Sequence, residues 1–318
     1  MLGALALSFA MLAVNAGPCA AETTPPAAAV CNDVRNDVGS DASGKSPAPQ
    51  SCSAAGTYSG EDPAAENDLL EAANQARELA GVPPLRMEES LREAARTHAQ
   101  RMVESERLEH RLSGEPALLE RIAQAIDLSP DNLSPDSTSD SALKIDRAGE
   151  NIANATCAPG ANEVLMRSAP HRQNLLDRGF NIAGVAAIWS KGRLYVVEDL
   201  ARQVPSYSAR ESASLVGRAI GEMRQQAGLP ELVQVSPPKL DEAACALARE
   251  SRPNAHLLAT AYDNRKIVTY TQSHPEVLPA GALRLLEDPG VRQFAVGACY
   301  ARNAAYPTGM YWVAILLY

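Results

Sequence analysis

Two short stretches of the chain carry residue types that could do chemistry. One is 149–152, Gly-Glu-Asn-Ile, and the other is 168–176, which contains His171. Ser168 is a suitable helix N-cap and a proline follows it in the first turn, so a short helix is predicted over 169–178. The dipole at a helix N-terminus disfavours imidazolium, so His171 is expected to be neutral, the form that binds a metal or accepts a proton. Together the two stretches are expected to place a glutamate and a histidine at the edges of helices.

Two further histidines precede these stretches. His98 falls on an apolar stripe of helical spacing, so a hydrogen-bonded core histidine is favoured over a site residue there. The stripe consists of Leu91, Ala94, Ala95, His98 and Met102. His110 follows where the chain leaves this helix, within 108–111. A site residue and a solvated loop histidine both fit that position.

The surrounding patterns predict a domain that mixes helices with an antiparallel sheet. An aspartate followed by proline starts a helix, which a glycine stops. The expected elements are a helix over 63–79, a helix over 118–126, an exposed acidic loop over 129–146, a helix over 162–167, and two strands over 181–189 and 193–200 joined as a hairpin.

Composition narrows the class of protein. The 318 residues have a formal net charge of -9 and no basic stripe, which argues against nucleic acid or an anionic membrane surface as the main partner. An apolar run at 2–14 has the length of a signal peptide, so we expect 1–21 to be removed on export. Residues 22–60 are rich in Pro, Ala and Ser and are expected to form a disordered linker. The protein is therefore predicted to be secreted, periplasmic or on the cell surface.

The six cysteines suit an oxidising compartment. They stand at positions 19, 31, 52, 157, 245 and 299 and contain no spacing typical of a zinc knuckle. The pairs we favour are Cys31 with Cys52 and Cys245 with Cys299, although sequence alone leaves the connectivity open.

An internal repeat divides the folded part of the chain. Three segments of the second half resemble segments of the first: 219–230 resembles 72–83, 240–244 resembles 91–95, and 294–300 resembles 182–188. A domain at 61–204 is therefore expected to be followed by a degenerate, shortened copy at 206–318. Counting back from Gly297 places Arg284 where His171 stands, so any chemistry would be confined to the first copy.

The order and spacing of several motifs resemble the CAP superfamily, the cysteine-rich secretory, antigen 5 and pathogenesis-related-1 proteins, in its bacterial extracellular form. The match covers about 66–200 and rests on Asn74 with Arg77, Val82-Pro83-Pro84-Leu85, His98-Ala99, His110, Gly149-Glu150-Asn151-Ile152, His171-Arg172-Gln173-Asn174-Leu175 and Gly184. The resemblance implies an α+β fold, a three-layer α-β-α sandwich around an antiparallel sheet, present here as two tandem copies.

The resemblance also implies a cavity lined by two histidines and acidic residues, matched here by His110, Glu150 and His171. In that family the cavity can bind a divalent cation, and other members bind lipids or sterols. Two neutral imidazoles and a carboxylate suit zinc, with a fourth position open to water.

The chain departs from the family pattern at three places. Met166 replaces a usual tryptophan, Ser168 or Ala169 stands where eukaryotic relatives carry a second cavity glutamate, and Glu198-Asp199-Leu200 replaces the Gln-Asp-Phe of bacterial relatives. The four-residue constellation of those relatives is therefore incomplete.

Three functions remain open. The leading one is a secreted binding module whose cavity holds zinc, a small molecule, a lipid or a cell-envelope ligand. The second is a metal-dependent hydrolase of envelope peptides or esters with Glu150 as base, and the third is a structural or adhesive envelope protein whose two copies pack together. Binding is favoured over catalysis, because no general base and oxyanion donor stand out.

Overall fold

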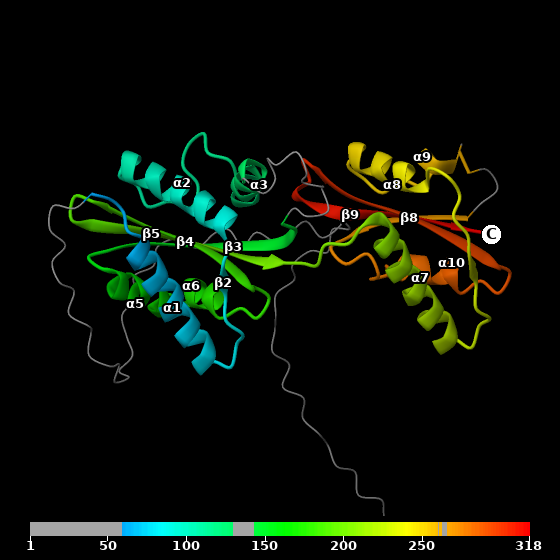
Figure 1. The fold of residues 1–318 in the computed structure, drawn as a ribbon, viewed down its shortest axis with the longest axis horizontal. Helices are drawn as coiled ribbons and strands as arrows, with labels where there is room; N and C mark the ends of the chain where they lie inside the picture. The colour runs from blue at the N-terminus through cyan, green and yellow to red at the C-terminus, as the bar shows by residue number, and fades with distance from the viewer. Residues whose placement is uncertain (1–58, 130–142, 260, 263–265) are drawn as a thin grey trace, which may run out of the picture.

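The computed structural model describes residues 59–129, 143–259, 261–262 and 266–318. The predicted signal peptide, nearly all of the predicted linker and the predicted Cys31–Cys52 pair lie outside these residues. The described chain forms two α+β units side by side, the first in blue to green and the second in yellow-green to red (Figure 1). We call residues 59–203 the first unit and residues 209–318 the second unit.

The first unit is built on a sheet with strand order β1-β4-β5-β3, to which β2 adds by parallel pairing with β4. Helices α2 and α3 cover one face, and α1, α5 and α6 cover the other, which gives three layers (Figure 1). The elements are β1 Gly60–Glu61, α1 Pro63–Leu79, β2 Arg86–Met87, α2 Glu89–Ser105, α3 Leu118–Leu128, β3 Ile145–Ala155, α5 Ala158–Arg167, α6 Ala169–Leu175, β4 Ile182–Ser190 and β5 Arg193–Gln203.

Local signals explain where several elements begin and end. The Asp62 carboxylate caps α1 by accepting a hydrogen bond from the Ala65 N–H at 3.0 Å, as the sequence predicts. The β4–β5 hairpin turns at Lys191 and Gly192, whose φ angles of 50° and 73° match a type I′ turn. The predicted helix over 169–178 is too long, because α6 ends at Leu175. Beyond it, the Asp177 carboxylate accepts from the Gly179 N–H at 2.7 Å and holds a turn.

The expected position of Glu150 at the edge of a helix is wrong. Glu150 lies in the middle of β3, where it pairs with Asp199 of β5, and Asn151 pairs with Glu198. The Gly-Glu-Asn sequence does not indicate this strand, because all three residue types are depleted in strands. Pairing with β5 along ten residues overrides that local preference.

The second unit has a sheet with strand order β6-β8-β9-β7. Helices α8 and α9 lie on one face and α7 and α10 on the other (Figure 1). The elements are α7 Ala209–Gln226, β6 Val233–Gln234, α8 Leu240–Arg249, α9 His256–Ala259, β7 Lys266–Gln272, α10 Ala280–Leu286, β8 Gln293–Asn303 and β9 Tyr306–Leu317.

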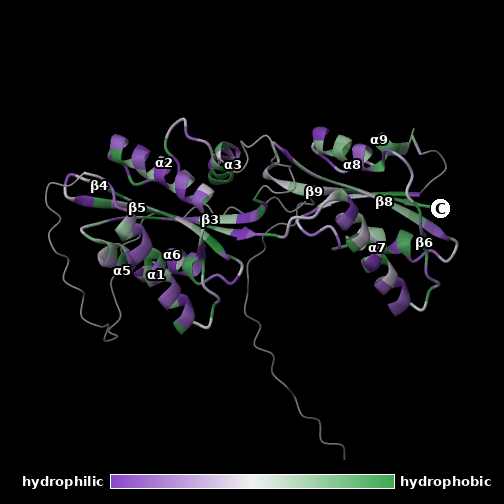
Figure 2. Cartoon of the chain, in the orientation of Figure 1, coloured by the Kyte–Doolittle hydropathy of each residue, from purple (hydrophilic) through white to green (hydrophobic). Residues whose placement is uncertain are grey.

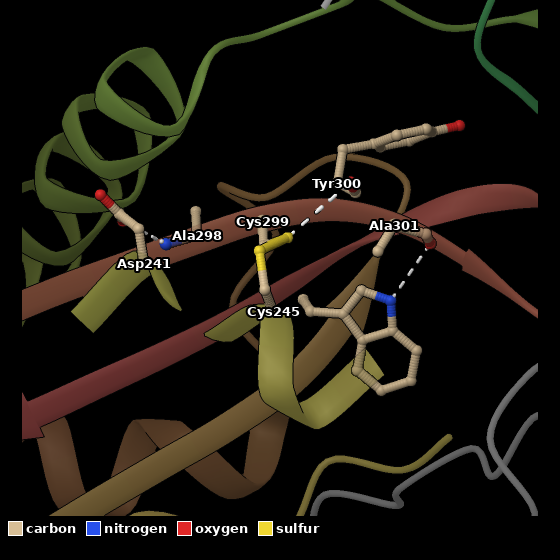
Figure 3. The surroundings of a disulfide bond; sticks show 7 residues. Asp241, Cys245, Ala298, Cys299, Tyr300 and Ala301 are labelled. Atoms are coloured by element: carbon tan, nitrogen blue, oxygen red, sulfur yellow. Dashed lines mark hydrogen bonds between the residues drawn. A yellow bond between two sulfur atoms is a disulfide. The ribbon is translucent and has the colours of Figure 1, made fainter. Parts of the chain in front are cut away.

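A disulfide joins α8 to β8 in the second unit. Figure 3 shows the bond between Cys245 and Cys299, with an S–S distance of 2.03 Å. The predicted Cys245–Cys299 pair is therefore confirmed. Cys157 of the first unit is also disulfide-bonded.

The two units contact each other beside β3. The buried Lys144 side chain, which directly precedes β3, places its Nζ 4.3 Å from the Tyr300 ring centroid and 3.3 Å from the Tyr311 hydroxyl. Arg302 of β8 forms an ion pair with Asp127 at the end of α3. The helices carry hydrophilic residues as well as hydrophobic ones (Figure 2), and no helix in the described ranges is both long and apolar enough to cross a membrane.

Candidate functional site

The three predicted site residues come from three different elements and meet at the β3 edge of the first sheet. His110 lies in the connection from α2 to α3, Glu150 in the edge strand β3, and His171 in α6. His110 Nδ1 lies 2.9 Å from Glu150 Oε1. The His110 and His171 ring centroids are 6.2 Å apart, with the planes tilted by 50°. Because α6 and the α2–α3 connection belong to opposite helical layers, only the sheet edge allows this meeting.

The two imidazoles differ in exposure. The His110 side chain is 48% exposed, whereas His171 is half-buried. His171 buries its Nδ1 atom, which has no hydrogen-bond partner among the described residues. A buried ring nitrogen without a partner requires an explanation, because buried polar atoms are normally hydrogen-bonded.

Burial, rather than a helix dipole, keeps both histidines neutral. Burial lowers the pKa of His171, with a smaller contribution from His110. Burial also lowers the pKa of His110, with a second contribution from the positive charge of Arg121. Neutral His171 agrees with the prediction, but the α6 helix spans seven residues and Ser168 makes no side-chain capping bond.

Arg121 of α3 holds the other oxygen of Glu150. Its Nη2 donates to Glu150 Oε2, and its Nη1 donates to the His110 carbonyl oxygen at 3.2 Å. The side chain is 5% exposed. Sequence reasoning missed Arg121, although a signal was present: the arginine interrupts the apolar face of α3 between Leu118 and Ile122.

A second carboxyl group lies beneath Glu150. Asp199 is fully buried directly across the β3–β5 pairing. Burial raises the pKa of Glu150 to about 7. Burial and the neighbouring Glu150 charge raise the pKa of Asp199 well above its usual value. Two adjacent buried carboxyl groups cannot both ionise cheaply, so this pair retains a proton near neutral pH.

His98 is a core histidine, as the apolar spacing predicts. Its Nδ1 lies 2.8 Å from Glu115 Oε1, and the other Glu115 oxygen accepts from the Leu112 N–H at 3.0 Å. His98 Nε2 lies 3.8 Å from Glu150 Oε2, which links this pair to the site. Burial lowers the pKa of His98.

Two asparagines link β3 to α6 on the face of the sheet opposite to the Glu150 side chain. Asn151 Nδ2 donates to the His171 carbonyl oxygen at 3.2 Å and to Glu198 Oε2 at 3.1 Å. Asn174 Nδ2 donates to Asn151 Oδ1 at 3.1 Å. These bonds anchor α6 on β3 and so position His171 beside His110.

The arrangement meets the requirements of a zinc site in part. Zinc would need Nε2 of His110, because Nδ1 faces Glu150, together with a ring nitrogen of His171. His110 and Arg121 engage both oxygens of the Glu150 carboxylate, so Glu150 could serve as a third ligand only by sharing an oxygen with one of them. Within the described ranges, no group of three or more His, Cys, Asp or Glu residues is arranged to hold a metal ion. Glu150 instead orients the imidazole of His110, as carboxylates do for metal-binding histidines.

The fold and the site define a class: an α+β domain in which a histidine from each helical layer meets over the edge of a central sheet. Residues 70–200 match the model of the cysteine-rich secretory protein family, CAP. This part of the chain is a CAP domain of that family. No curated protein is significantly similar to the chain.

Three solved structures are similar to parts of the chain. An extracellular protein with an SCP domain from Bacillus anthracis is 19% identical, covers 44% of this chain and 40% of its own, and has a TM-score of 0.36. A cysteine-rich secretory protein from Staphylococcus aureus is 20% identical, covers 44% and 39%, and has a TM-score of 0.30. An outer surface protein from Borrelia burgdorferi is 13% identical, covers 46% and 99%, and has a TM-score of 0.39. The first two matches span less than half of those proteins, and none is close enough to transfer a ligand or an activity.

Proposed function

We propose that the protein is an exported binding module whose recognition groups are the His110 and His171 imidazoles. The observation that carries the proposal is the meeting of two neutral rings from separate layers, one of them with an orphaned buried nitrogen. A ligand would give this nitrogen a partner. The Cys245–Cys299 disulfide supports export, because disulfides persist in oxidising compartments.

The ligand chemistry that this pair suits best is weak coordination of a divalent transition metal such as zinc. His110 Nε2 and His171 would hold the ion, with Glu150 orienting His110 from below. A zinc ion bound by two protein ligands would leave coordination positions for an oxygen or nitrogen of a small molecule or an envelope component. The carboxyl pair beneath the rings would remain part of the protein's internal hydrogen-bonding.

Calorimetry with zinc chloride on the full exported chain tests this proposal. His110→Ala and His171→Ala should each weaken zinc binding at least tenfold, because each variant loses one of the two ligands. His256→Ala, which removes an exposed histidine from the second unit, is the matched control and should bind as the unsubstituted protein does. Equal zinc binding by all four proteins, or no binding by any of them, would contradict the proposal.

We further propose that the second unit is a degenerate copy of the first. Three observations support this: the strands pair in corresponding order, a parallel short strand adds to each sheet, and a glycine of each sheet lies against the start of the helix above it. Gly184 lies beside Leu91, and Gly297 lies beside Leu240. An experimental structure in which 209–318 cannot be superimposed on the corresponding elements of the first unit would refute the proposal that the second unit is a copy.

The alignment of the two units changes one expectation from the sequence. Each of the short helices α6 and α10 ends at a residue whose carbonyl oxygen accepts from a buried arginine, Leu175 and Leu286 respectively. When those contacts are aligned, Ala282 rather than Arg284 takes the place of His171. Counting from Gly297 gave Arg284 because two residues are added between α10 and that glycine. In either alignment the imidazole is missing from the second unit.

A further inference from the structure

Arg121 occupies an unusual place in the site. It is a charged residue on the buried face of α3, and its guanidinium lies between Glu150 and the carbonyl oxygen of His110. A third charge, Glu115, lies close by, with Oε2 3.8 Å from Arg121 Nη1. The side chains of Arg121 and Glu150 are each 4% exposed, so water contributes little to either charge.

A buried ion pair of this kind is difficult to open. Separating the partners leaves an uncompensated charge in a medium of low dielectric constant, which is far more costly than breaking a surface ion pair. Glu150 could bind a metal ion only by leaving Arg121 or by sharing its oxygen with a second cation. The positive charge of Arg121 also acts on His110, because it contributes to the lowered pKa of that imidazole.

We propose that Arg121 serves as the built-in cation of this CAP site. Its guanidinium holds Glu150 as the hydrogen-bond acceptor that orients His110, and so prevents Glu150 from serving as a metal ligand. The inference deepens the proposed function, because it concerns the same pair of imidazoles. It specifies that those imidazoles bind metal without a carboxylate and that the identity of residue 121 sets the affinity. A neutral residue at this position would release one Glu150 oxygen toward the imidazoles.

The test compares zinc binding by the unsubstituted full chain and by Arg121→Gln, using calorimetry. Glutamine keeps a donor and much of the side-chain length but removes the charge. Arg121→Gln should bind zinc at least tenfold more tightly. Arg101→Gln is the matched control, because it removes an equal charge from the exposed face of α2, and it should leave zinc affinity unchanged within twofold. Circular dichroism on thermal unfolding checks that each variant is folded.

A second variant keeps the inference testable if Arg121→Gln does not fold. Glu150→Gln retains an oxygen that can accept from His110, so it should weaken zinc binding, through looser orientation of that ring, by less than His110→Ala does. Loss of zinc binding in Glu150→Gln would overturn the inference, since it would show that Glu150 is a ligand despite Arg121. Equal affinities for Arg121→Gln and the unsubstituted protein would overturn it as well.

The two proposals fail in distinguishable ways. If the unsubstituted protein binds no zinc but Arg121→Gln does, the metal part of the proposed function fails and the role of Arg121 stands. If the unsubstituted protein binds zinc through His110 and His171 and Arg121→Gln binds no more tightly, the proposed function stands and the role of Arg121 fails. If neither protein binds zinc, both fail.

Discussion

Arg77 in the first unit and Arg224 in the second make corresponding contacts, whereas the polar site beside His110 belongs to the first unit. Arg77 donates to the carbonyl oxygens of Pro83 and Leu175, each at 2.7 Å. Arg224 donates to those of Pro230 at 2.7 Å and Leu286 at 2.5 Å. The shared arginine therefore serves the fold, because it satisfies loop carbonyls that would otherwise be buried without a donor.

The edge strands show where the units differ. In β3 the centre of the strand carries Glu150, whose carboxylate organises His110 and Arg121. The corresponding edge strand β7 reads Lys-Ile-Val-Thr-Tyr-Thr-Gln and has no carboxylate. An edge strand of this kind can thus exist without the charged cluster, which supports the proposal that the cluster of the first unit serves ligand binding rather than folding.

The largest expected effect comes from the shared arginines. Arg77→Met and Arg224→Met keep most of the apolar stem but leave buried carbonyls without donors, at about 1–3 kcal/mol for each group. Each variant should therefore lose at least ~3 kcal/mol of unfolding free energy in its own unit. Urea unfolding followed by the fluorescence of Trp189 in the first unit and Trp312 in the second, each in a background where the other tryptophan is phenylalanine, resolves the two units.

Arg172→Met is the control for the arginine comparison. Arg172 is exposed and donates to the single carbonyl of Met166, so its loss should change stability by less than about 0.5 kcal/mol. A loss in Arg77→Met much larger than that in Arg224→Met would show that the two arginines do not play the same part.

The glycines beneath the helices should show the next largest effect. A Cβ built on Gly184 would lie 2.0 Å from the Leu91 carbonyl carbon, and one on Gly297 would lie 2.4 Å from the Leu240 oxygen. Gly184→Ala and Gly297→Ala should each cost about 1–3 kcal/mol, because α2 and α8 must move away from the sheets. Thermal unfolding by calorimetry measures the loss.

Gly221→Ala provides the matched control for this close approach. Gly221 lies inside α7 with no atom within 4 Å of a built Cβ, so alanine there should raise stability by roughly 0.5–1 kcal/mol. Destabilisation by Gly221→Ala, or tolerance of alanine at both sheet positions, would contradict the packing described for the two units.

A smaller effect is expected from the buried carboxyl groups, which among the described residues lie in the first unit. Burial raises the pKa of Glu198 to about 7, from an ordinary value of 4.5. The folded state therefore holds a proton that the unfolded state has lost, and Glu198 makes stability fall as pH rises from about 4.5 to about 7. The slope from one such group is at most about 1.4 kcal/mol per pH unit. Glu198→Gln should gain stability relative to the unsubstituted protein across that range.

Urea unfolding of both proteins at several pH values measures the effect of Glu198. The histidines with lowered pKa values make stability rise with pH in both proteins. Their contribution therefore cancels when the stability of one protein is subtracted from that of the other. Glu163→Gln, at an exposed glutamate of α5, should follow the unsubstituted protein at every pH. Parallel stability curves for Glu198→Gln and the unsubstituted protein would show that Glu198 does not carry the expected proton.

The sequence predicts those elements that carry local signals. The α1 helix has a capping aspartate and a starting proline, and the β4–β5 hairpin has a Lys-Gly turn. The Cys245–Cys299 pair is favoured because both cysteines lie in the second half of the chain. The CAP resemblance over the first unit rests on ordered motifs, which a family comparison can recognise although each motif is weak alone.

The elements and site residues that the sequence does not predict depend on contacts between distant segments. Glu150 lies in a strand because β5, nearly fifty residues later, pairs with it, and no local preference of Gly-Glu-Asn indicates this. Likewise, Arg121 joins the site only when α3 packs over the sheet, and Asp199 joins it only when β5 pairs with β3. A trio of His110, Glu150 and His171 could thus be named from sequence, but the engagement of both Glu150 oxygens could not.

The central claim is that His110 and His171 together form the binding site of the first unit. Histidine ring-nitrogen NMR spectra, recorded on the full chain during a zinc titration, test it most directly. We predict that the ring resonances of His110 and His171 change together with one common binding curve, while those of His256 and His274 in the second unit remain unchanged. Independent responses of His110 and His171, or a response that begins at His256 or His274, would contradict the claim.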